Sequence, residues 1–283
     1  MMNVRNSLIG LIVSAALTGV VSCGGGGGGG SGTPAAPATV IRSASLNGAQ
    51  AGTTATGTGR GAVVVNPTTM EITGGTTFTG LTAAPTAAHI HRLSGTPFLP
   101  LNLAADNATA TVPAGTVLSS ADYAELLAGY LYFNVHTPAS PNGEIRGQIT
   151  GTTGVTAGLA TLNGAQENST NVSTATGRGT IVFDLTTPHE ILIGYVTHNV
   201  TGTTTNAHIH TGAPGVSGAA NVLQLFQETN LWRAPTPPAG LSDQAVTDMT
   251  AGNTYFNVHS SNNLCPPAAS CAAGEIRGQI AIQ

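Results

Sequence analysis

"YFNVHTPASPNGEIRGQI", residues 132–149, decides the fold, because its two halves return as "YFNVH", residues 255–259, and "GEIRGQI", residues 274–280. Three other motifs recur in the same order: "LNGAQ" at 46–50 and 162–166, "TGRG" at 58–61 and 176–179, and "AHIH" at 88–91 and 207–210. Because all of these motifs recur in the same order, they indicate a duplicated domain. Each copy is too long to be one unit of a solenoid repeat. We place the two copies at residues 39–150 and 156–283.

Each copy has the composition of strands joined by turns. Small and β-branched residues are punctuated by Gly and Pro, and "GRGAVVVNPTTMEITGGTTFTGL", residues 59–81, predicts a strand, a turn and a strand. One short helix is predicted before each "YFNVH", at residues 119–129 and 242–252, opened by a serine cap and closed by a glycine. The chain is therefore predicted to be all-β, with two tandem antiparallel Greek-key-like β-sandwich or barrel domains that each carry one short helix.

The histidines of the repeated motifs share one face of the predicted strands. Side chains alternate across a strand, so both imidazoles of "AHIH" lie opposite Ala88 and Ile90, and His136 lies opposite Phe133 and Val135. If "AHIH" lies near the "YFNVH" strand, which spacing alone does not show, three neutral imidazoles converge and suit Cu(II) or Zn(II), with an open position for water or substrate. The candidate metal ligands are His89, His91 and His136, and in the second copy His208, His210 and His259.

The strand "GEIRGQI" places charged side chains on the same face. The turn "TPASPNG" predicts a hairpin that brings His136 close to Glu144. We expect the charged residues either to orient a metal ligand or to form plain cross-strand ion pairs: Glu144, Arg146, Glu275 and Arg277. The competing interpretation is that all these polar groups, histidines included, are ordinary solvated surface.

The N-terminus predicts export. Residues 1–22 have one basic residue and then an apolar run too short for a spanning helix, and they resemble a bacterial lipoprotein signal peptide that ends at Cys23. The resemblance implies that Cys23 is lipidated and anchors the protein to a membrane of the bacterial cell envelope, at the outer membrane or its periplasmic face. Residues 23–38, rich in Gly and Pro, predict a tether between anchor and fold.

The two remaining cysteines predict a disulfide, and the charge of the chain argues against nucleic acid as a partner. Cys265 and Cys271 are an even pair in an exported chain, within residues added to the second copy, so we expect a disulfide that clips a lengthened hairpin loop. With 8 Lys and Arg and a net charge of −4, the chain has no basic stripe for nucleic acid.

"AHIH" followed by "YFNVH" and "GEIRGQI" resembles the chordin-type (CHRD) domain, and both copies match. That family includes a growth-factor-binding animal protein, so the resemblance implies a protein partner, whose contact residues no motif identifies. "TGLTAAPTAAHIH", residues 79–91, is more distantly similar to copper/zinc superoxide dismutase, where a His-x-His pair binds copper on a Greek-key barrel. This likeness supports copper at His89 and His91 and at the matching pair of the second copy. Neither copy has the dismutase set of further zinc and copper ligands.

These patterns predict an exported metal-binding protein, with copper as the first choice and zinc as the second. The alternatives are a metal-free interaction or adhesion module of the cell surface and, last, a dismutase-like redox enzyme. No nucleophile elbow, Cys/His dyad or Walker loop is present in the sequence, so we do not expect an enzyme that turns over an organic substrate.

Overall fold

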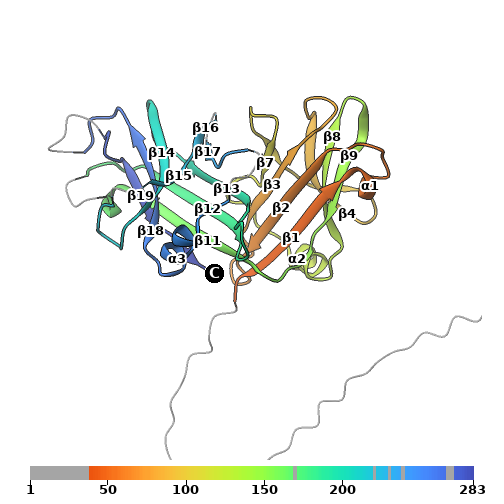
Figure 1. Ribbon diagram of the computed structural model, residues 1–283, viewed down its shortest axis with the longest axis horizontal. Helices are drawn as coiled ribbons and strands as arrows, with labels where there is room; N and C mark the ends of the chain where they lie inside the picture. Colours follow the sequence, from red (N-terminus) through yellow and green to blue (C-terminus); the bar gives the residue numbers. More distant parts are fainter. Residues whose placement is uncertain (1–37, 168–170, 219–220, 229–230, 237–239, 266–270) are drawn as a thin grey trace, which may run out of the picture. The chain divides into compact units, whose positions relative to one another are not determined.

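The two copies form two antiparallel sheets in the computed structural model (Figure 1). The structure describes residues 38–167, 171–218, 221–228, 231–236, 240–265 and 271–283. The predicted signal peptide, Cys23 and all of the predicted tether except residue 38 lie outside these residues. No helix in the described part of the chain has the length and apolar character needed to cross a membrane.

Domain 1, the first copy, contains ten strands. In chain order they are β1 (Val40–Asn47), β2 (Thr58–Val65), β3 (Ile72–Thr79), β4 (Ala87–Arg92), β5 (Pro97–Pro100), β6 (Asn102–Leu103), β7 (Thr109–Thr111), β8 (Leu131–Thr137), β9 (Ser140–Gln148) and β10 (Thr150–Gly151). Their order in the sheet is β5-β4-β8-β9-β1-β2-β3-β7-β6, with β10 paired to β1. The pairing of β9 with β1 joins the end of the domain to its beginning and nearly closes a barrel.

Domain 2 repeats this arrangement strand for strand. Its strands are β11 (Val155–Asn163), β12 (Thr176–Asp184), β13 (Ile191–His198), β14 (Thr204–Thr211), β15 (Asn221–Gln224), β16 (Phe226–Gln227), β17 (Leu231–Arg233), β18 (Thr254–Ser260), β19 (Ile276–Gln279) and β20 (Ala281–Ile282). The order β15-β14-β18-β19-β11-β12-β13-β17-β16 matches that of domain 1, and β20 pairs with β11. The predicted tandem all-β fold is confirmed.

The predicted helices form with serine caps. In α2 (Ser120–Leu127), Ser119 and Asp122 make a reciprocal capping box, which satisfies backbone donors at the start of the helix. In α3 (Asp243–Thr250), the side chain of Ser242 accepts a hydrogen bond from the third residue of the helix. Leu126 and Met249 are fully buried, so each helix closes one end of its domain's core.

Each domain also contains a helical turn that the sequence pattern did not predict. The motif "LNGAQ" forms α1 (Gly48–Ala51) in domain 1 and a 3₁₀ turn, η1 (Gly164–Gln166), in domain 2. The side chains of Asn47 and Asn163 cap these turns. The prediction of a single helix per domain was therefore too low, because a turn this short has no apolar periodicity to reveal it.

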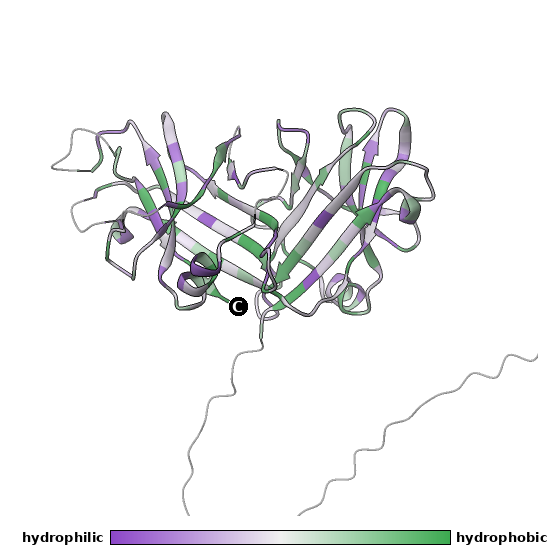
Figure 2. Cartoon of the chain, in the orientation of Figure 1, coloured by the Kyte–Doolittle hydropathy of each residue, from purple (hydrophilic) through white to green (hydrophobic). Residues whose placement is uncertain are grey.

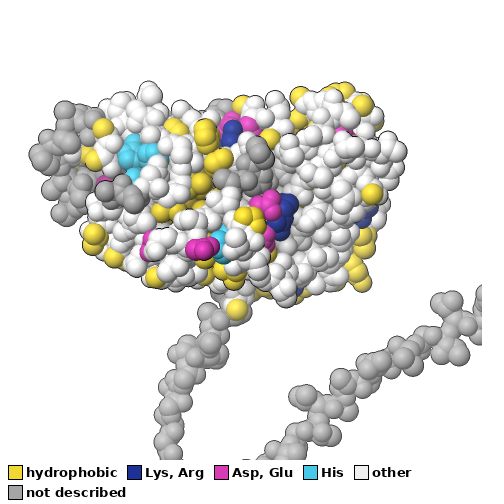
Figure 3. Space-filling view, viewed as in Figure 1, with side chains coloured by type: hydrophobic (Ala, Val, Ile, Leu, Met, Phe, Trp, Pro, Cys, Tyr) yellow, Lys and Arg dark blue, Asp and Glu magenta, His cyan; other side chains and the backbone are white. Residues whose placement is uncertain are grey.

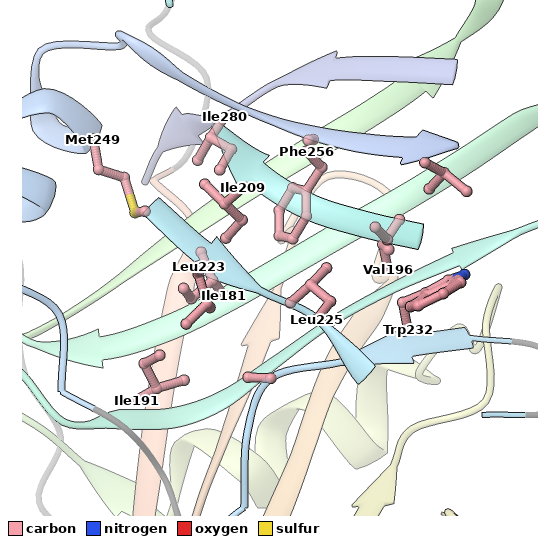
Figure 4. Packing of buried hydrophobic residues seen from close by; sticks show 14 of the residues in the cluster. Ile181, Ile191, Val196, Ile209, Leu223, Leu225, Trp232, Met249, Phe256 and Ile280 are labelled. Atoms are coloured by element: carbon pink, nitrogen blue, oxygen red, sulfur yellow. The ribbon is translucent and has the colours of Figure 1, made fainter. Parts of the chain in front are cut away.

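The apolar side chains predicted to face inward form the two cores. Ile90, Phe133 and Val135 lie in the core of domain 1, all fully buried. In domain 2 the ring of Phe256 packs among Ile209, Val196 and Leu225, while Met249 reaches in from α3; Figure 4 shows these side chains converging. Polar and apolar positions are interleaved along the strands (Figure 2), as the two-residue period of a strand requires.

The glycines of "TGRG" have a packing role. A Cβ on Gly61 would lie 2.7 Å from Cε2 of Phe133, and one on Gly179 would lie 2.3 Å from Cδ2 of Phe256. Both separations are shorter than carbon atoms tolerate. Each glycine therefore makes room for the aromatic ring contributed by "YFNVH", which explains why the two motifs recur together.

A third cluster joins the domains within the compact unit formed by residues 36–283. Ala62 and Val64 of β2 belong to the same buried cluster as Val182 of β12 and Tyr195 of β13. The Tyr195 hydroxyl lies 2.7 Å from Oγ1 of Thr73 on β3. In β2, β12 and β13, the side chains that do not belong to their own domain's core are therefore buried as well.

Candidate metal centre

The three candidate histidines of domain 1 meet at the β4 and β8 ladder. His89 pairs with Asn134 across the ladder, and Ala87 pairs with His136, so His89 and His136 are diagonal neighbours on one face. Nδ1 of His89 lies 3.1 Å from Nε2 of His136. One nitrogen from each of His89, His91 and His136 lies within 4.8 Å of the others. The convergence that spacing could not establish therefore exists.

Backbone carbonyls determine which nitrogen of two rings carries a proton. Nδ1 of His136 lies 3.0 Å from the Pro141 oxygen, and Nδ1 of His91 lies 3.0 Å from the Gly95 oxygen. Because a carbonyl oxygen can only accept, both Nδ1 atoms donate and both Nε2 atoms carry a lone pair. The lone pair of His136 Nε2 faces Nδ1 of His89. Nε2 of His91 is buried without a partner among the described residues. Such a carbonyl partner is what commonly orients a metal-binding imidazole.

Domain 2 builds the same cluster. Nδ1 of His208 lies 3.1 Å from Nε2 of His259, and His208, His210 and His259 also offer nitrogens within 4.8 Å of one another. Nδ1 of His259 donates to the Ala272 oxygen at 2.9 Å. Both ring nitrogens of His210 are buried without a partner in the described part of the chain. A buried imidazole with an unused lone pair is poised for a ligand, because leaving that group unpaired costs free energy.

Burial lowers the pKa of most of these histidines. It is the main cause for His89, His91, His208 and His259, with neighbouring imidazoles adding to the effect at His89. For His210, burial and then the adjacent imidazoles lower the pKa to about 4. A lowered pKa keeps the rings neutral at pH 7, which is the form that binds a metal.

The clusters are less exposed than predicted. The alternation placed the histidines on an outward, solvated face, but His136 and His259 each keep only 8% of their surface and His91 keeps 5%. Every residue of β8 and β18 is buried, so both faces of these strands are covered. Histidine side chains still reach the surface over the region of β14 and β18, on the left of Figure 3. The interpretation of the histidines as ordinary solvated surface therefore does not describe these clusters.

A tyrosine and an arginine stack behind one histidine of each cluster. The Tyr132 ring stacks on His91 at a centroid distance of 5.3 Å, and Cζ of Arg146 lies 3.5 Å from the centroid of Tyr132. In domain 2 the corresponding distances are 5.4 Å between His210 and Tyr255 and 3.4 Å between Arg277 and Tyr255. The sequence pattern identified the arginines and missed the tyrosines, although "YFNVH" recurs with its tyrosine in both copies.

The expected pairs of Glu144 with Arg146 and of Glu275 with Arg277 do not form. Glu144 is fully buried and accepts hydrogen bonds from the backbone and hydroxyl of Thr82 and from the hydroxyl of Thr137. Burial alone would raise the pKa of Glu144, but these hydrogen bonds hold it below its ordinary value. A register shift between Val135 and Thr137 ends the regular pairing there. Glu144 therefore anchors the residue next to His136 and does not contact the imidazole.

Glu275 has the equivalent role in domain 2. It accepts from the hydroxyls of Ser173 and Ser260 and from the amide of Asn262. Ser260 follows His259, as Thr137 follows His136. In both domains, hydroxyl donors from the end of the adjacent strand and from a loop packed against it take the place of the predicted guanidinium partner.

The predicted disulfide is confirmed. Cys265 and Cys271 are bonded, six residues apart. Ala272, whose carbonyl orients His259, directly follows the second cysteine, and the Cys271 oxygen accepts from the Ser260 backbone at 3.2 Å. The disulfide lies next to a carbonyl that orients one of the clustered histidines, a link that sequence position alone did not reveal.

One histidine outside the clusters is also buried. Only 7% of the surface of His189 is exposed. Its Nε2 lies 3.0 Å from a carboxylate oxygen of Asp243, at the start of α3, and its Nδ1 bonds to the Asp184 oxygen. His189 therefore links a turn to a helix. Asp243 is the one metal-binding side chain among these two contacts.

Comparison with known protein families gives a match in both copies of the repeat. A family model described as CHRD domain matches residues 42–149 and 159–280. No curated protein and no solved structure matches the chain, so the likeness to superoxide dismutase stays a prediction. Because the two matches cover most of the chain and coincide with its two repeated sheets, the protein belongs to the CHRD-domain family and carries the domain twice.

Proposed function

We propose that each CHRD domain binds one copper ion through its three histidines, with zinc as the second choice. The observation that carries the proposal is the convergence of three imidazole nitrogens within 4.8 Å in both domains. Two nitrogens bound to one tetrahedral ion at about 2.0 Å lie roughly 3.3 Å apart, close to the 3.1 Å that separates His89 from His136.

The donor set favours copper. It consists of neutral imidazoles, and the two buried glutamates nearby are held by hydroxyl and amide donors. Among divalent first-row ions, nitrogen sites bind copper most tightly. Three protein ligands leave a coordination position open for water or another ligand.

We further propose that this binding takes place outside the cytoplasm on a lipid anchor at Cys23. The signal-like residues 1–22 and the tether of residues 23–38 support this, and the disulfide is of the kind that persists in oxidising compartments. The function would be to hold or hand over metal at the cell envelope, without turnover of an organic substrate. No nucleic acid is expected as a partner.

Copper titration of the purified exported chain tests the proposal. Equilibrium dialysis followed by metal analysis should give two equivalents for the unaltered chain, one for His136→Ala and none for His136→Ala/His259→Ala. His198→Ala, which alters a histidine outside both clusters, is the matched control and should keep two. If the double variant binds as much copper as the control, the histidine clusters are not the binding sites.

A further inference from the structure

The stack of histidine, tyrosine and arginine recurs in both domains with nearly the same distances, which marks it as a built feature. Tyr132 lies between His91 and Arg146, and Tyr255 lies between His210 and Arg277. The two separations in domain 1 place Cζ of Arg146 no farther than about 9 Å from the centre of the His91 ring. A positive charge thus lies one aromatic ring behind a metal ligand.

Among the described residues, no carboxylate forms an ion pair with Arg146 or Arg277. Arg277 keeps 1% of its surface and donates to the oxygens of Ala213 and Val216 and to Gln279. Arg146 is partly exposed and donates to Gln148. The charge of Arg146 is held by a neutral acceptor and by the tyrosine face, so no carboxylate cancels its field locally. In domain 2 the buried carboxylate of Glu167 lies close enough to interact with the charge of Arg277, which opposes the rise that burial causes in the pKa of Glu167.

We propose that Arg146 biases the three-histidine site of domain 1 toward the monovalent ion Cu(I) over Cu(II) and Zn(II). This inference rests on the proposed function. Three imidazoles bring no negative charge, so the full charge of the bound ion faces the guanidinium. The repulsion is twice as large for a divalent ion as for a monovalent one. Three ligands also suffice for Cu(I), whereas Cu(II) and Zn(II) take four or more.

The test compares two substitutions of Arg146 in a chain that keeps only the site of domain 1. The parent is the full chain with His208→Ala and His210→Ala. Arg146→Gln removes the charge and leaves a planar amide on Tyr132, while Arg146→Lys keeps the charge and removes the planar stack. Cu(I) affinity is measured without oxygen by competition with bicinchoninate, and Cu(II) affinity by competition with nitrilotriacetate.

We expect the ratio of Cu(I) to Cu(II) affinity to fall about fifteenfold in Arg146→Gln and to stay near the parent value in Arg146→Lys. This factor corresponds to one unit of ion charge at roughly 10 Å from one guanidinium, with an effective dielectric constant of about 20. An unchanged ratio in Arg146→Gln, or an equal fall in both variants, would overturn the bias while leaving copper binding intact. Failure of the parent to bind either ion would overturn the proposed function as well. Circular dichroism of each variant verifies that the fold is kept.

Discussion

Removing the disulfide of domain 2 with Cys265→Ser/Cys271→Ser should destabilise the protein by a definable amount. The bond closes a loop with a sequence separation of 6. The chain-entropy relation for a loop of this size gives a loss of about 2 kcal/mol in the free energy of unfolding, because the unfolded chain gains conformational freedom. Urea unfolding of the metal-free chain measures this difference, and the m-value should change little.

The same substitution should weaken metal binding in domain 2 alone. The Ala272 oxygen, next to Cys271, accepts the Nδ1 hydrogen of His259 at 2.9 Å and directs Nε2 to the cluster. Loss of such an orienting partner typically costs ten- to hundredfold in metal affinity. In domain 1 the Pro141 oxygen orients His136 from a turn without cysteines, so that site is an internal control.

Copper affinity of the domain 2 site is measured in the full chain carrying His89→Ala and His91→Ala, with and without the cysteine substitutions. The cysteine substitutions are also made in the chain that keeps only the domain 1 site, where affinity should not change. If domain 2 loses stability by the expected amount but binds copper with undiminished affinity, the disulfide does not position His259. If unfolding is unaffected, the loop-closure reasoning is wrong.

Three further predictions concern pH, packing and location. Burial lowers the pKa of His210 from its ordinary 6.5 to about 4, so the unfolded chain binds a proton more readily than the folded one. The metal-free chain should therefore be most stable above pH 6.5 and lose stability as the pH falls toward 4. Equal urea midpoints of unfolding at pH 7.5 and pH 5 would contradict this. Gly179→Ala should lower the free energy of unfolding by about 1–3 kcal/mol in urea, because its Cβ would lie 2.3 Å from Phe256, and a neutral effect would refute that packing. Cys23→Ala should move the protein from the membrane fraction to the soluble fraction on centrifugation, and retention in the membrane would argue against the lipid anchor.

Much of the fold could be predicted because it depends on local patterns. Two-residue alternation identified Ile90, Phe133 and Val135 as core, and the serine and glycine boundaries located both helices. The repeat made these patterns convincing, because each appears twice in the same order. The turns at "LNGAQ" were missed since they have only four and three residues, too few to show a helical repeat of apolar positions.

The sequence pattern predicted which histidines form the candidate site, but it predicted the wrong partners for the charged residues around them. The repeated histidines are the ones that converge, but Glu144 bonds to Thr82 and Thr137 and makes no ion pair with Arg146. Alternation puts residues on a face, and it gives no information on which loop packs against that face. The contact with Thr82 joins residues 62 positions apart in the chain, and no local pattern encodes it.

The sequence by itself determined the duplication, the strand class of the fold, the disulfide and the identity of the six histidines, because all of these are expressed in composition, spacing and alternation along the chain. Only the tertiary structure decided that β4 pairs with β8, that carbonyls orient His136 and His259, and that a tyrosine separates each arginine from a clustered histidine. The reason is physical: strand pairing between distant segments depends on the packing of the whole core, and that packing sets the position of every side chain around the histidine clusters.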